Sequence, residues 1–88
     1  MATVHNLVGA RLANRALAAF AKGDLEAARR DYLRVLELVP GNLPTTINLG
    51  LLEHRAKKFA EAERLLKQVL RSAPESGFAW LILGVIYY

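Results

Sequence analysis

The sequence contains no cysteine, and histidine and serine are scarce. The absence of cysteine excludes a disulfide framework, a thiolate zinc site and a cysteine nucleophile. His5 and His54 are too few for a metal site, and Ser72 and Ser76 suit helix caps better than a Ser-His-Asp arrangement. The six glycines are scattered, so they form no phosphate-binding loop. We therefore expect no enzyme: no catalytic residue, no bound metal and no cofactor.

Long apolar runs are also absent. The longest covers residues 78–88, eleven positions, whereas a membrane-spanning helix needs about 20. No basic segment followed by an apolar run marks the start of the chain as a secretory signal. We therefore expect no membrane association and favour the cytoplasm.

Charge of one sign is in modest excess. Lys and Arg number 12 and Asp and Glu 8, which gives a net charge of +4. The excess permits a loose attraction to acidic partners without specifying one. Basic residues alternate with acidic ones rather than with aromatics, so nucleic-acid binding is not favoured. Hydrophobic residues make up 53% of the chain, which is too many for a disordered protein.

The most informative feature that is present is an internal repeat. Pro40 and Pro74 lie 34 positions apart, and so do Asn14 and Asn48. The segments 24–40 and 58–74 align without gaps at the same spacing. Another series joins small residues at the same interval: Ala16, Gly50 and Gly84. A period of this length is typical of helical repeats that stack on one another.

Each unit is predicted to contain two helices. From Leu25 to Val39, apolar residues recur at i, i+3, i+4 and i+7, and the pattern returns from Phe59 onwards. We expect helix caps at Asp24, Asn42 and Ser76. The pair Glu63 and Lys67 has the i, i+4 spacing of a solvated ion pair.

Small residues are expected where helices cross. Helices pack about 8–10 Å apart, and a small side chain allows that approach. The expected crossing residues are Ala28, Gly50, Ala62 and Gly84. Trp80 and Tyr87 are expected to fill the gaps beside them.

These residues resemble the tetratricopeptide repeat family. Its first-helix pattern, W-x2-L-G-x2-Y, is matched in full by Trp80, Leu83, Gly84 and Tyr87. The resemblance covers residues 9–88, with repeat 1 at about 9–42, repeat 2 at about 43–76 and the first helix of a third repeat at 77–88. It implies a single all-α domain over residues 1–88, an α-solenoid of antiparallel helix pairs in a right-handed superhelix.

The resemblance also implies a non-enzymatic scaffold that binds a peptide or protein segment in its concave groove. By column, the groove candidates are Asn14, Leu17, Asn48, Leu51 and Arg55. Of the clamp residues with which some relatives hold a chaperone's terminal carboxylate, this chain has only Asn48. An apolar groove that also uses Phe78 and Ile82 fits a helix or a hydrophobic peptide better.

The last predicted helix, residues 77–88, is apolar all round, and such a helix requires burial on more than one side. We expect a piece of a longer array that self-associates as a homo-oligomer. The candidate contact residues are Phe78, Trp80, Leu81, Ile82, Val85 and Tyr88.

Two alternatives stay open. One is a purely structural self-assembly segment without a peptide ligand. The other is an RNA-binding helical repeat of 35 residues, although two such units drift out of step with the observed period by one position.

Overall fold

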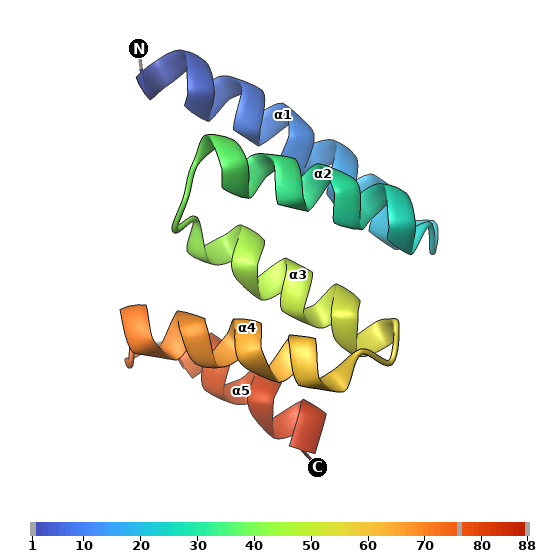
Figure 1. The fold of residues 1–88 in the computed structure, drawn as a ribbon, viewed down its shortest axis with the longest axis vertical. Helices are drawn as coiled ribbons and strands as arrows, with labels where there is room; N and C mark the ends of the chain where they lie inside the picture. The colour runs from blue at the N-terminus through green and yellow to red at the C-terminus, as the bar shows by residue number, and fades with distance from the viewer. Residues whose placement is uncertain (1, 76, 88) are drawn as a thin grey trace. The chain divides into compact units, whose positions relative to one another are not determined.

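A computed structural model describes the backbone of residues 2–75 and 77–87 and the side chains of residues 6–75, 77 and 80–84. Within these ranges the chain forms helices and no strand, which confirms the all-α class (Figure 1). The helices are α1 (Ala2–Ala21), α2 (Leu25–Leu38), α3 (Leu43–Arg55), α4 (Phe59–Ser72) and α5 (Gly77–Tyr87). The chain divides into two compact units, Met1–Thr45 and Thr46–Tyr88, and each is described by itself.

The first unit is built on α1 and α2, which run antiparallel and pack on each other (Figure 1). Ala16 of α1 and Ala28 of α2 are fully buried, and Val35 is 2% exposed. Gly9 lies close to α2 as well, since a Cβ added there would be 3.4 Å from Cγ2 of Val39. The expected small residues therefore lie in the interior of this pair.

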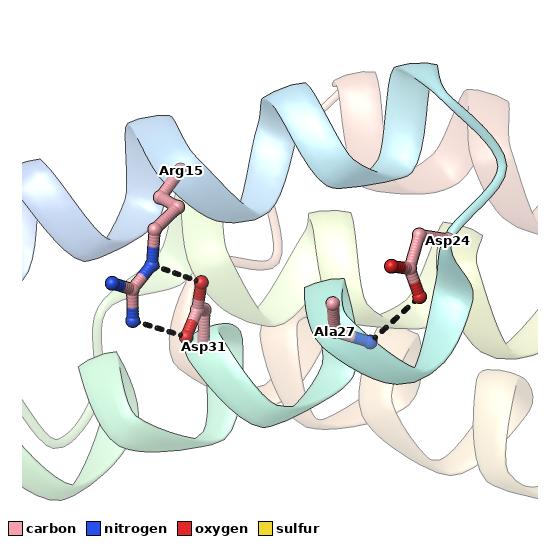
Figure 2. A network of polar contacts seen from close by, with 4 residues as sticks. All are labelled: Arg15, Asp24, Ala27 and Asp31. Atoms are coloured by element: carbon pink, nitrogen blue, oxygen red, sulfur yellow. Dashed lines mark hydrogen bonds and ion pairs between the residues drawn. The ribbon is translucent and has the colours of Figure 1, made fainter.

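The caps that the sequence predicts in the first unit are confirmed. The Asp24 carboxylate accepts a hydrogen bond from the Ala27 backbone N–H at 3.2 Å, at the start of α2 (Figure 2). Oδ1 of Asn42 accepts one from the Thr45 backbone N–H at 2.9 Å, at the start of α3. Ser76, the third expected cap, lies outside the described residues.

A bidentate ion pair joins α1 to α2. Nε of Arg15 donates to Oδ2 of Asp31 at 2.7 Å, and Nη2 donates to Oδ1 at 2.8 Å (Figure 2). The Asp31 side chain is only 8% exposed, whereas that of Arg15 is 69% exposed. The hydrogen bonds from Arg15 lower the pKa of Asp31 despite its burial, which acts in the opposite direction. The pair therefore keeps a buried carboxylate charged.

The second unit has leucines where the first has this ion pair. At a spacing of 34 residues, Leu49 corresponds to Arg15 and Leu65 to Asp31. Both leucines are buried, at 3% and 5% exposure. The exchange changes both columns together. A leucine at position 15 alone would leave the Asp31 carboxylate buried without its partner.

In the second unit, Gly50 of α3 meets Leu66 of α4. A Cβ added to Gly50 would be 3.1 Å from Cγ of Leu66 and 3.2 Å from its Cδ2. Leu66 and Ala62 are fully buried. The close approach expected at Gly50 is therefore confirmed, and a larger residue there would require the Leu66 side chain to shift.

Two expectations for α5 are wrong. An added Cβ at Gly84 has no described atom within 4 Å, so Gly84 is not a crossing residue among the described helices. Trp80 does not fill a gap: it is 58% exposed, and its Nε1 donates to the Pro74 carbonyl at 3.0 Å. The reason is that α5 packs on α4 through another face, which contains the buried Ile82 and Leu83. The Tyr87 side chain lies outside the described residues.

Gly50 and Gly84 provide a matched test of the crossing. We expect Gly50→Ala to destabilise the fold by about 1–3 kcal/mol, because the new methyl group overpacks Leu66. Gly84→Ala, at the same repeat position, should be neutral or add up to about 1 kcal/mol through helix propensity. Urea unfolding of both variants measures the difference. Equal effects from the two substitutions would contradict the crossing at Gly50.

Leucine, the residue that the second unit has at the equivalent positions, provides a test of the ion pair when it replaces Arg15 and Asp31. Arg15→Leu should lower the urea midpoint because it leaves the Asp31 carboxylate buried without its partner. The double variant Arg15→Leu/Asp31→Leu should recover most of the loss. If the double variant is less stable than Arg15→Leu alone, the exchange of columns is not the explanation.

The wild type and the double variant should also differ in how their stability depends on pH. Because the pKa of Asp31 is lowered in the folded state, its contribution is present above the unfolded pKa of about 3.9 and is lost as the pH falls through the folded value. We therefore expect the wild type to lose stability relative to the double variant below about pH 4. Parallel curves down to pH 2.5 would contradict a charged Asp31.

Candidate functional site

One face of α1 is exposed from Leu7 to Leu17. Asn14 and Leu17 lie on it, as the sequence predicts, and Leu17 is 56% exposed. Leu7, which is 55% exposed, and Ala10 continue the same i, i+3, i+4, i+7 stripe. Neither Leu7 nor Ala10 was predicted from the sequence, although their spacing from Asn14 identifies them. The stripe offers an amide beside apolar side chains, a combination that suits a polypeptide ligand.

The corresponding face of α3 is less open. Asn48 and Leu51 are half-buried, and Arg55 is exposed in the last turn. The two faces belong to different units, so a groove that combines them stays a prediction. Taken singly, each face presents an Asn and a Leu three positions apart, one turn of helix.

Charges on the second helix of each unit are largely paired within that helix. Glu63 and Lys67 form the expected i, i+4 pair at 2.7 Å. At i, i+3, Arg64 binds Glu61 at 2.9 Å, Arg34 binds Glu37 at 2.7 Å, and Arg29 binds Glu26. The hydrogen bond from Arg64 lowers the pKa of Glu61. These pairs are solvated helix support and leave few carboxylates for other roles.

A basic turn between α3 and α4 stands out against this background. Arg55, Lys57 and Lys58 are exposed there and are followed by Phe59, which is 53% exposed. This turn was not predicted from the sequence. The signal was present in the aligned repeat, where Gly23 and Asp24 stand in place of the two lysines.

The self-association candidates on α5 fall into three groups according to the exposure of their side chains. Trp80 and Leu81 are exposed, at 58% and 63%. Ile82 is 8% exposed, so its side chain is already used inside the unit. The side chains of Phe78 and Val85, and all of Tyr88, lie outside the described residues.

In residues 6–75, 77 and 80–84, no cluster of three or more His, Asp or Glu is placed to hold a metal ion. Of the helices in the described part of the chain, none has both the length and the hydropathy for crossing a membrane.

Comparison with known proteins identifies the repeat. The family model described as tetratricopeptide repeat matches residues 6–75, which is more than half of the chain. None of the curated proteins compared with the chain matches it. Tetratricopeptide repeats generally act as protein-interaction scaffolds and are typically non-catalytic. The match agrees with the antiparallel pair α1–α2, the crossing at Gly50 and the all-α fold, and the chain belongs to the tetratricopeptide repeat family.

Proposed function

We propose that this chain is a protein-interaction module that pairs with a second copy of itself through the outer face of α5. The observation that carries the proposal is the face of α5 formed by the exposed Trp80 and Leu81 and the half-buried Gly84. Two large apolar side chains lie more than half exposed beside a glycine with open space around it. Covering such a face with another apolar surface lowers the free energy, because apolar area is removed from water.

The repeat itself indicates what kind of surface fits. Gly50, 34 positions before Gly84, receives the Leu66 side chain of a neighbouring helix at close range. Gly84 offers the same small residue with no described neighbour. A helix with an apolar side chain at the crossing point is therefore the natural occupant.

The absence of charged residues from α5 permits a second copy as that occupant. The chain has a net charge of +4, so two copies repel each other over most of their surface. The sequence of α5 contains no Lys, Arg, Asp or Glu. Two α5 helices therefore approach without placing like charges in contact, and a twofold dimer buries the same stripe on both copies.

Substitution of Leu81 tests this proposal. At tens of micromolar, we expect the wild type to sediment above its 9.7 kDa monomer mass and Leu81→Glu to sediment as a monomer. A buried carboxylate in the interface is costly, so the shift should be complete. Leu33→Glu is the matched control, because Leu33 is 47% exposed on α2 and the charge change is identical. A monomeric wild type, or dissociation by both variants, would refute pairing through α5.

A second candidate function is peptide binding by the first helix of each repeat. It is supported by the exposed stripe of α1, in which Asn14 and Leu17 lie together, and by Asn48, Leu51 and Arg55 on α3. An amide side chain can donate to and accept from an extended peptide backbone. Leu17 and Leu51 supply the apolar contacts.

Removal of the two amides tests peptide binding. Peptides selected from a displayed library on the wild type should bind Asn14→Ala/Asn48→Ala about tenfold more weakly, since each lost hydrogen bond is worth about 0.5–1.5 kcal/mol. The urea midpoint should stay unchanged. Gln68→Ala, at an exposed amide on α4, is the control and should bind normally. Undiminished binding to the double variant, or no selected peptide at all, would favour the purely structural alternative.

A further inference from the structure

The turn between α3 and α4 concentrates positive charge. Residues 54–58, His-Arg-Ala-Lys-Lys, carry three formal positive charges and no negative one, in a chain whose net charge is +4. In the described part of the structure, no carboxylate lies within ion-pair distance of Lys57 or Lys58. The nearby Glu61 forms its ion pair with Arg64, and Lys58 acts on it as a more distant charge that helps to lower its pKa. The two lysines thus present their charge to solvent.

The first unit forms the same turn with different residues. Its backbone bonds run from Gly23 N–H to the Phe20 carbonyl and from Asp24 N–H to the Ala19 carbonyl, both at 2.9 Å. This is the double hydrogen bond that ends many helices at a residue in the left-handed region. Gly23 occupies that region with a φ of 84°.

The second unit repeats this geometry with lysines. Lys57 N–H donates to the His54 carbonyl at 3.0 Å, and Lys58 N–H donates to the Glu53 carbonyl at 2.8 Å. Lys57 takes the place of Gly23 and has a φ of 64°, which its side chain disfavours. Lys58 takes the place of Asp24, and its side chain makes no cap hydrogen bond. Both exchanges give up stability that the first unit keeps.

An exposed aromatic ring adjoins the lysines. Phe59 is 53% exposed, and its ring meets that of His54 edge to face, with centroids 5.3 Å apart. The contact fixes the position of the ring beside the charged turn while leaving about half of the side chain open. The patch therefore combines an apolar surface with two solvent-facing ammonium groups.

We propose that this basic turn is a docking surface for an acidic segment of a partner protein. Carboxylates of the partner pair with Lys57 and Lys58, and an apolar side chain of the partner contacts Phe59. The fit favours a short peptide over nucleic acid, because a strand of nucleic acid needs a longer basic track with several stacking rings, and here one ring adjoins one turn. A binding role at this turn explains why positions 57 and 58 have lysines in place of the glycine and the cap residue of the first unit.

Restoration of the first unit's chemistry tests the proposal. In Lys57→Gly/Lys58→Asn, a glycine enters the left-handed position and an amide cap enters the start of α4. The probe is a fluorescein-labelled peptide of five glutamates around one phenylalanine, measured by anisotropy at low salt. We expect the variant to bind the probe at least about tenfold more weakly than the wild type, since it loses two charge-assisted contacts. Its urea midpoint should rise, so misfolding cannot explain the loss.

A control removes equal charge elsewhere. Lys22→Gln/Arg71→Gln also lowers the net charge by two at exposed positions and should bind within about twofold of the wild type. Equal losses in both variants would reduce the effect to net charge and overturn the site. Undiminished binding of the probe to Lys57→Gly/Lys58→Asn, or a fall in the urea midpoint of that variant, would also overturn the site. Tighter turn-dependent binding of a ten-nucleotide oligothymidylate or of anionic vesicles would reassign the surface to nucleic acid or membrane.

Discussion

The constraint on which this fold depends is the distance between neighbouring helices. An antiparallel pair hides its apolar stripe only if the helices approach closely, and close approach requires a small residue at the crossing. Gly50 meets that requirement against Leu66, and Ala16 is fully buried at the same repeat position in α1. A spacing of 34 residues returns the small residue to this place in each unit. Other positions are freer to change.

The two units show what freedom the constraint leaves. Equivalent columns hold an ion pair between the exposed Arg15 and the buried Asp31 in one unit, and two buried leucines, Leu49 and Leu65, in the other. Both solutions satisfy the same rule, that nothing charged is buried alone. The two columns thus differ together between the units, and the helices form with either pair of residues.

Periodicity and residue type were sufficient to predict the helices, the caps at Asp24 and Asn42, and the crossing at Gly50. They were insufficient for α5, where Trp80 and Gly84 match the family pattern but lie on an open face. The repeat pattern predicts which side chains a neighbouring helix would contact, but it does not show that such a helix is present. The ion pair of Arg15 was missed for a related reason, because pairing depends on two columns 16 residues apart rather than on either one.

An internal repeat also separates residues kept for folding from residues kept for binding. Where two units adopt the same backbone, the residues at equivalent positions can be compared directly. The residue that suits the backbone better shows how much stability the other one gives up. Gly23 and Asp24 satisfy the turn after α1, so Lys57 and Lys58, which form the same hydrogen bonds at a cost in stability, need another reason to be present. The same argument applies to Trp80, because its indole is 58% exposed even though its Nε1 donates to the Pro74 carbonyl. Surfaces that cost a repeat stability without improving its packing are therefore the places where partners of this chain should be sought.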